Sequence, residues 1–222
     1  MIPETDIPPA ALPPRPDTRP PESPHVLRGM ASLAVAGVAI FVGAVLIADF
    51  AVPDHDWIAD TISDLGAGRL AFIVDIGIYA YSLSLIACAV AASHVHLGGR
   101  GWTVGRYVLI ATGLIVFLVG ARNEYGDGDS TGIVIHTYLV CALGLGFAVM
   151  PWIMSPGVGS VSPGAAMVCR AVTVLWVPLA PVFFFLPTGF DGLYERVLGG
   201  ITFAFVLALA WTFNLRARKP AT

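Results

Sequence analysis

The stretch DHDWIADTISDLGAGR, residues 54–69, runs directly into LAFIVDIGIYAYSLSLIACAVAA, residues 70–92. The first part is a polar segment with four aspartates and one histidine, and the second is apolar and carries a single charged residue, Asp75. About 20 apolar residues suffice to cross a bilayer as a helix. Because an ionisable side chain inside such a run is costly, Asp75 indicates a functional site. The two segments together predict a membrane helix that begins beside an acidic loop.

Five further apolar runs of similar length surround this one. The chain of 222 residues is 56% hydrophobic and only 12% charged, whereas an ordinary soluble domain has roughly 25% charged residues. Its mean hydropathy is +0.79. The predicted fold is therefore all-α, a polytopic integral membrane protein with six transmembrane helices. The predicted spans are residues 29–51, 70–92, 104–121, 132–154, 165–187 and 193–214.

The two ends of the chain differ in composition from the predicted spans. Residues 1–24 hold nine of the seventeen prolines, a composition typical of disordered or polyproline-like segments. We therefore predict a disordered Pro-rich tail over residues 1–28, a transmembrane domain over 29–214 and a basic C-terminus over 215–222.

The loop of residues 52–69 has a two-sided pattern. Its apolar residues can face the membrane while its acidic residues face water, which predicts a short outer interfacial helix. The apolar set is Trp57, Ile58, Ile62 and Leu65, and the polar set is Asp56, Asp60, Ser63 and Asp64.

The distribution of basic residues predicts the orientation, because cytoplasmic loops carry an excess of Lys and Arg. Nine basic residues fall in the two termini and in the loops after the second and fourth spans, and three fall on the opposite side: Arg69, Arg122 and Arg196. Both termini are thus expected in the cytoplasm of a protein of the plasma membrane. The acidic loops then face outward.

Small residues, prolines and cysteines within the spans give further expectations. Small residues favour close helix approach, which we expect at Gly144 with Gly146, Gly199 with Gly200, and Ala39 with Gly43. A kink is expected in the fifth span, which carries Pro178, Pro181 and Pro187, because proline removes a helical hydrogen bond. The three cysteines, Cys88, Cys141 and Cys169, show no C-x-x-C spacing and are expected to be buried apolar residues.

Four residues are candidates for chemistry at the outer face: Asp64, Asp75, His136 and Glu195. His136 lies about one helical turn inside the fourth span, at a depth similar to that of Asp75. An Asp75–His136 hydrogen bond satisfies both groups in a structural role. The same two residues can instead orient and deprotonate a water molecule, or hold a divalent metal. No cofactor is otherwise expected.

Four further residues are candidates for ligand binding: Ser63, Arg69, Arg122 and Arg196. Each of the three outer entries into a span carries one of the arginines, and arginine forms bidentate pairs with carboxylate or phosphate. The N-termini of the second, fourth and sixth spans point at the same face and favour anions. Pairing of the arginines with local acids is the structural alternative.

Three short motifs give the chain a resemblance to a known family: Ile62-Ser63-Asp64-Leu65-Gly66, His136-Thr137 and Glu195-Arg196. With these motifs the sequence resembles the bacterial and archaeal membrane family catalogued as domain of unknown function 998, over roughly residues 30–214. The resemblance implies a six-span helical membrane protein with characteristic polar positions at Ser63, Asp64, His136, Glu195 and Arg196. It implies no activity.

Two functions are compatible with these residues. The first is a module that binds or moves a polar lipid head group or a small solute, with membrane lipids as partners. The second is a membrane-embedded hydrolase that uses Asp and His, with or without a metal. The sequence contains no nucleophile elbow, phosphate loop or H-E-x-x-H pattern, which favours the first. The net charge of -3 disfavours nucleic acid as a partner.

Overall fold

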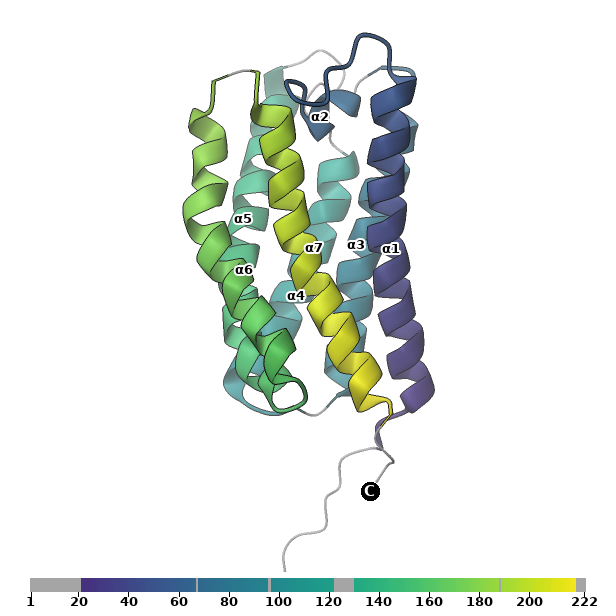
Figure 1. Ribbon diagram of the computed structural model, residues 1–222, viewed down its shortest axis with the longest axis vertical. Coiled ribbons are helices and arrows are strands. Elements are labelled where there is room, and N and C mark those ends of the chain that lie inside the picture. The colour runs from purple at the N-terminus through teal and green to yellow at the C-terminus, as the bar shows by residue number, and fades with distance from the viewer. Residues whose placement is uncertain (1–20, 67, 96, 122–129, 188, 219–222) are drawn as a thin grey trace, which may run out of the picture.

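The structure is a computed structural model that describes residues 21–66, 68–95, 97–121, 130–187 and 189–218, with the backbone alone described for residues 130–134. In this part of the chain every regular element is a helix (Figure 1). Six helices are long and apolar enough to cross a membrane, which confirms the predicted fold class of a multi-pass helical membrane protein. The long helices are α1 (Pro24–Ala51), α3 (Ala71–His94), α4 (Arg100–Ala121), α5 (Ser130–Gly159), α6 (Pro163–Val182) and α7 (Asp191–Arg216); the short elements are α2 (Ile62–Leu65) and the 3-10 helix η1 (Phe183–Phe185).

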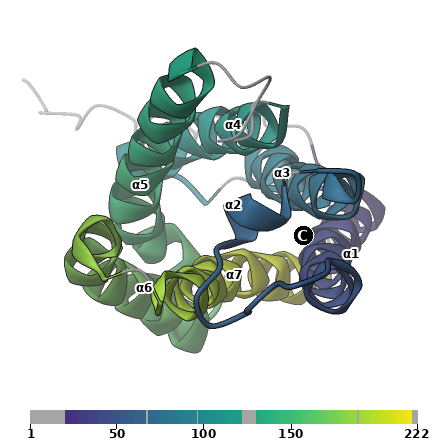
Figure 2. The same ribbon diagram turned by 90° about the horizontal axis from the view of Figure 1, so that it is seen from above.

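The helices form a ring. Each long helix packs on the next one in the chain, and α7 closes the ring by packing on α1. The first residue of α1 and the last of α7 lie at one end of the bundle, called here the terminal end, while α2 lies at the opposite end, called the α2 end (Figure 1). Seen from the α2 end, the short helix α2 lies inside the ring rather than on its rim (Figure 2).

The first helix begins earlier than the sequence predicts, at Pro24 instead of residue 29. Proline is well tolerated in the first turn of a helix, where its missing N–H has no intrahelical role. This early start is tied to the end of α7, because Arg28 donates to the carbonyl of Ala217 at 3.2 Å and Arg216 Nε donates to Glu22 at 2.7 Å. The predicted disorder of the tail concerns mainly residues 1–20, which lie outside the described residues.

Helices α1 and α3 approach closely at two glycines. A Cβ at Gly37 would overlap the carbonyl oxygen of Ala80 and the hydroxyl of Ser84, and a Cβ at Gly77 would press on Ala44 and Phe41. Of the predicted contact positions, Gly146 packs tightly on Thr112, but a Cβ at Gly43, Gly144 or Gly200 would have no atom within 4 Å. The prediction was wrong at these three glycines because small residues permit close approach without requiring it.

The end of α6 follows its prolines. Pro178 and Pro181 lie inside the helix, which ends at Val182 and continues as the 3-10 turn η1. Tyr194 on α7 donates a hydrogen bond of 2.8 Å to the carbonyl of Leu179. A neighbouring helix thus supplies a donor where the backbone pattern of α6 changes.

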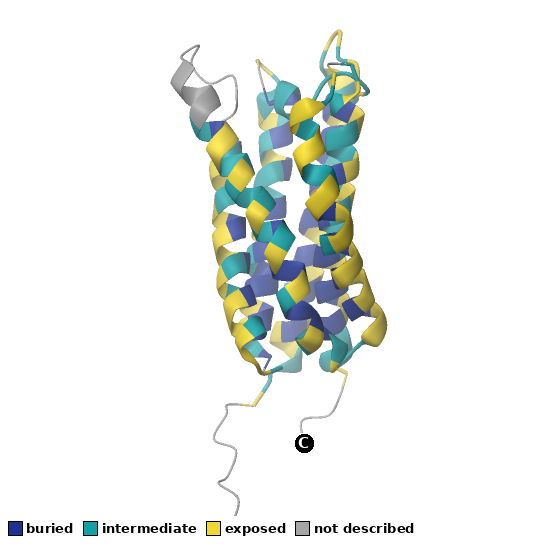
Figure 3. Ribbon diagram, turned by 90° about the vertical axis from the view of Figure 1, so that its left-hand side faces the viewer, coloured by how far each residue is buried: buried dark blue, intermediate teal, exposed yellow. Residues whose placement is uncertain are grey.

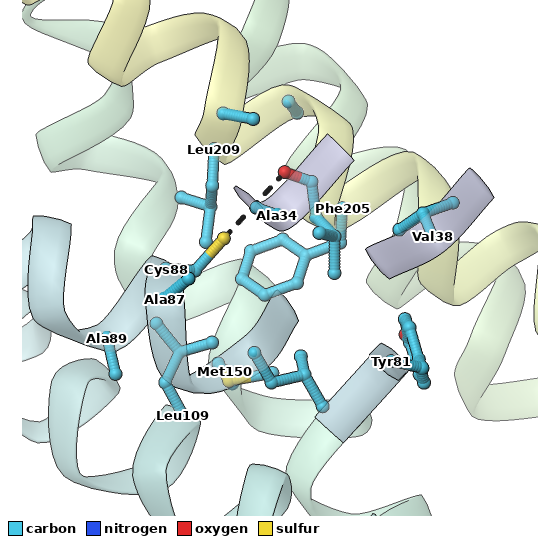
Figure 4. Close-up of a cluster of buried hydrophobic side chains, with 14 of the residues drawn as sticks. Ala34, Val38, Tyr81, Ala87, Cys88, Ala89, Leu109, Met150, Phe205 and Leu209 are labelled. Carbon is cyan, nitrogen blue, oxygen red and sulfur yellow. Dashed lines mark hydrogen bonds between the residues drawn. The ribbon is translucent and has the colours of Figure 1, made fainter. Parts of the chain in front are cut away.

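The core is concentrated toward the terminal end, where buried residues gather in the interior (Figure 3). Phe205, Leu209 and Leu109 have almost no exposed surface, and they belong with Cys88 to one cluster of buried side chains (Figure 4). Cys88 and Cys169 are buried as predicted, whereas Cys141 is exposed. Dense packing at one end leaves the other end to hold the polar residues of interest.

Candidate functional site

The helix α2 is formed by a local capping box. Thr61 Oγ1 accepts a hydrogen bond from the backbone N–H of Asp64 at 3.1 Å, and Asp64 Oδ2 accepts one from the backbone N–H of Thr61 at 2.6 Å. The two residues thereby satisfy two backbone donors that a helix start leaves unpaired. Asp64, a predicted catalytic residue, therefore has a structural role in starting α2.

The apolar side chains of α2 point into the bundle. Ile62 and Leu65 are buried in the core, whereas Trp57, in the preceding turn, is exposed. Among the described residues between Val52 and Leu70, the single turn of α2 is the only helix, so the structure does not show the predicted interfacial helix. The amphipathic pattern is real, but the apolar face packs on the other helices of the bundle instead of on lipid.

The loop that carries α2 is fastened to the start of α7. Leu193 N donates to the carbonyl of Ile58 at 3.0 Å, and Ile62 N donates to Glu195 Oε2 at 2.6 Å. A Cβ at Gly192 would overlap the carbonyl of Asp60, so the loop backbone lies directly against α7. These contacts hold α2 inside the ring.

Arg196 on α7 connects the α2 loop and α7 to α1. Its guanidinium donates to Asp49 at 2.5 Å and to the carbonyl of Asp60 at 3.0 Å. His55 Nε2 lies 3.1 Å from the same Asp49 carboxylate, and His55 Nδ1 lies 3.6 Å from Asp60 Oδ2. The side chains of Arg196, Asp49 and His55 are 15%, 12% and 3% exposed, whereas that of Asp60 is 40% exposed. The first three side chains are therefore largely desolvated. We call Asp49, His55, Asp60 and Arg196 the clasp.

Beneath α2 lies a cavity of about 750 Å³. Four polar residues line its upper part, each from a different helix: Ser63 from α2, Asp75 from α3, His136 from α5 and Glu195 from α7. Ser63 Oγ lies 3.5 Å from His136 Nε2. Asp75 makes no hydrogen bond or ion pair with any residue in the described part of the chain.

The rest of the cavity wall is almost entirely apolar. It includes eight aromatic residues, Phe41, Tyr81, Phe147, Trp176, Phe183, Phe184, Phe185 and Phe203. The hydroxyl of Tyr81 is satisfied by Thr202 Oγ1 at 2.8 Å. Leu145 on α5 and Phe185 on η1 line the cavity and are 70% and 84% exposed. The cavity therefore reaches the surface of the bundle on the side of α5 and η1.

The structure thus brings together Ser63, Asp75, His136 and Glu195, of the eight predicted site residues. Asp64 and Arg196 lie apart from the cavity lining, in the capping box and the clasp. Arg69 is exposed on the loop, and Arg122 lies outside the described residues. The arginine sites predicted for a ligand are therefore not part of the cavity wall that the structure describes.

Sequence reasoning missed two parts of the site. Asp49 and His55 form the clasp with Arg196. Pairing of Arg196 with a local acid was the structural alternative predicted from the sequence, but neither Asp49 nor His55 was identified as the partner. The aromatic wall was also missed, because Phe41, Trp176 and Phe203 are spread over three spans with no common motif. Within the described residues, no group of three His, Cys, Asp or Glu is placed to hold a metal ion.

Comparison with known proteins identifies a family and no closer relative. Neither the curated proteins nor the solved structures give a match. A family model described as "Protein of unknown function (DUF998)" matches residues 35–212, which include α2, the clasp and the cavity. The match covers most of the chain and bears out the resemblance carried by the three short motifs. The chain therefore belongs to the DUF998 family of proteins of unknown function.

Proposed function

We propose that this protein binds or moves a polar lipid head group or a small solute in the cavity beneath α2. One observation carries the proposal: a cavity of about 750 Å³ combines an apolar, aromatic wall with a small group of polar side chains at one end. Binding sites for small molecules commonly have volumes of about 300–1,000 Å³ and this division between apolar wall and a few polar groups.

The cavity's position supports an amphiphilic ligand. Its polar part lies just below α2, and its apolar part reaches the surface beside Leu145 and Phe185, where the helices border the membrane. A ligand can then place its head group near Asp75 and His136 and its apolar body along the aromatic wall. Burial of that apolar body supplies most of the binding free energy.

The predicted orientation places this cavity in the outer half of the plasma membrane, with both termini in the cytoplasm. The clasp and the α7 contacts hold the α2 loop over the cavity at this end. Exchange of a ligand through the side opening would then need no change in the clasp.

A cavity-filling variant tests the proposal. Gly144 lines the cavity, and a Cβ there would meet no atom within 4 Å, so Gly144→Leu places a side chain in the ligand's space. Gly200→Leu is the matched control, because Gly200 is an exposed glycine of α7 with equally open surroundings. Both changes raise helix propensity. The bound material of all three purified proteins is then compared by native and untargeted mass spectrometry.

The proposal predicts a co-purifying ligand in the original protein and in Gly200→Leu, and its loss from Gly144→Leu. Absence of bound material from all three proteins, or equal retention by Gly144→Leu, would show that the cavity is not the binding site.

The contact between Ser63 and His136 favours a second candidate, a membrane-embedded hydrolase. A serine hydroxyl beside an imidazole is the arrangement of an activated nucleophile, and catalytic hydrogen bonds are often long in the unliganded enzyme. Asp75 and Glu195 line the same cavity and can assist proton transfer. In this hypothesis His136 accepts a proton from Ser63 or from a water molecule.

Covalent labelling tests the hydrolase hypothesis. A fluorophosphonate probe is expected to modify Ser63, with labelling lost in Ser63→Ala and His136→Ala. Metal analysis of the purified protein, with His136→Ala as the control, tests the metal-dependent form of the same hypothesis. Unlabelled Ser63 together with absence of a metal removes the serine-nucleophile form and the metal-dependent form of this candidate.

A further inference from the structure

Apart from the imidazole of His136, the ionisable side chains of the described cavity lining that carry a full charge are acidic. Two carboxylates, Asp75 and Glu195, line the cavity, and neither Lys nor Arg is found among its lining residues in the described part of the chain. Phosphate and sulfate groups are usually held by basic side chains. A negatively charged head group would meet two carboxylates here, and among the described lining residues only His136 could carry an opposing positive charge.

Among the described arginines, Arg196 is the nearest in sequence to a cavity-lining residue. Its guanidinium, however, is bound in the clasp. Its two terminal nitrogens donate to Asp49, Asp60 and Gly192. To reach a ligand in the cavity, the guanidinium would have to leave a largely desolvated carboxylate, which is costly. Arg196 neighbours Glu195 in sequence, yet the two side chains serve different sites.

Asp75 is a half-buried carboxylate without a hydrogen-bond partner among the described residues. It lies in the second turn of α3, lines the cavity and makes no hydrogen bond or ion pair with any residue that the structure describes. An ionisable group at membrane depth is normally paired with another polar group. Because Asp75 lines the cavity, a positively charged ligand bound there can supply the missing partner.

The aromatic wall suits the same chemistry. Phe41, Tyr81 and Phe203 form a cluster with ring centroids 5.1–5.6 Å apart, and all three rings line the cavity. Aromatic faces attract cations through the ring quadrupole, and they also pack well against an apolar body. One wall can therefore contact both parts of a lipophilic cation.

We propose that the cavity selects lipophilic organic cations, with the carboxylate of Asp75 opposing the ligand's positive charge. The inference rests on the proposed function and adds the charge class of the ligand. Two sources provide this chemistry: membrane lipids with an amine head group, and soluble lipophilic cations that enter from the membrane.

Two ions of nearly equal size and shape allow the effect of ligand charge on binding to be measured apart from the effect of hydrophobicity. Tetraphenylphosphonium is a lipophilic cation and tetraphenylborate is its anionic counterpart. Binding of each ion to the full-length protein in neutral maltoside micelles is measured separately by equilibrium dialysis, with empty micelles as the blank. Saturable binding of the cation is expected, stronger than that of the anion by about tenfold or more.

Three variants assign the charge effect to Asp75. Asp75→Asn keeps the side chain's size and is expected to weaken binding of the cation by about tenfold, while Asp75→Glu keeps the charge and retains binding. Asp54→Asn is the control, because it removes the same charge from an exposed position of the α2-end loop. Asp54 has a φ of 56°, and asparagine tolerates this left-handed conformation.

Competition identifies the source of the ligand. Displacement of the bound cation by lysophosphatidylethanolamine, but not by lysophosphatidylglycerol, indicates an amine-headed lipid. Failure of both lipids to displace it indicates a soluble cation.

Equal binding of the two ions, absence of cation binding, unchanged binding in Asp75→Asn, or displacement by lysophosphatidylglycerol would each overturn the inference. None of these results removes the proposed function, which is tested separately by the presence of co-purifying material and by its dependence on Gly144.

Discussion

Arg196, in the second turn of α7, donates a hydrogen bond of 2.5 Å to the carboxylate of Asp49 near the end of α1. These residues are 147 positions apart, and their contact joins the last membrane helix to the first. His55 and Asp60 complete the clasp from the loop between them. The clasp therefore closes the ring of helices at the end where the cavity lies.

Loss of either ion of the clasp is expected to destabilise the protein. Arg196→Met leaves the carboxylate of Asp49 largely desolvated, and Asp49→Asn leaves the guanidinium without its counter-charge. Each change should lower the free energy of unfolding by about 3 kcal/mol, measured by equilibrium denaturation in mixed micelles. Arg69→Met, at an exposed position, should change it by less than about 0.5 kcal/mol.

A double-mutant cycle checks that the two ions act on each other. The effects of Asp49→Asn and Arg196→Met should combine to less than their sum in the double variant. Additive effects would show that the ion pair contributes nothing of its own.

The close approach of α1 and α3 gives a steric prediction. Gly37→Ala forces a methyl group against the backbone of Ala80 and should lower the free energy of unfolding by about 1–3 kcal/mol. Gly29→Ala, in the same helix with open space around it, should be neutral or stabilising by up to about 1 kcal/mol. Thermal denaturation of both variants compares them directly, and equal midpoints would contradict the packing described for Gly37.

The number and approximate limits of the membrane helices could be predicted from sequence, because the length of an apolar run is a local property of the chain. The direction in which α2 faces could not. Ile62 and Leu65 carry an apolar face that suits either lipid or protein, and only the tertiary packing decides between them. The start of α1 at Pro24 was missed for a related reason, since Glu22 and Arg28 are held by partners at the far end of the chain.

The site was predicted in part for the same reasons. Asp75 and His136 could be predicted as site residues because they are ionisable groups inside apolar runs. The structure places both in the lining of one cavity. Arg196 was predicted as a ligand-binding residue, but the sequence alone could not show that Asp49 would bind it. The choice of partner depends on which helices are neighbours, and the closure of α7 on α1 is a property of the whole ring.

The cysteines give a test of cavity access. Cys141 is exposed and lines the cavity, whereas Cys88 and Cys169 are buried. N-ethylmaleimide should therefore modify Cys141 alone in the folded protein in detergent, and all three cysteines after unfolding in dodecyl sulfate. Peptide mass spectrometry locates the modification. Labelling of Cys88 before Cys141 would contradict the packing of the core.

The orientation predicted from nine basic residues against three is tested by cysteine placement. In a variant whose native cysteines are replaced by alanine, Asp56→Cys should react with a membrane-impermeant maleimide in intact cells. Ser160→Cys, at the opposite end of the bundle, should react only after permeabilisation. Both positions are exposed, so the opposite result would reverse the orientation.

The fluorescence of Trp176 tests the central claim, that the cavity beneath α2 is a ligand site, most directly. Trp176 is buried and lines the cavity, whereas Trp211 is exposed on α7. Two variants that keep only one of these tryptophans, with phenylalanine at the other four positions, are titrated with an amphiphile that has an ammonium head and a brominated chain. Saturable quenching of Trp176 is predicted, with only gradual, non-saturating quenching of Trp211, and Gly144→Leu should abolish the saturable part. Equal quenching of the two tryptophans, or saturable quenching of Trp176 that survives Gly144→Leu, would contradict the claim.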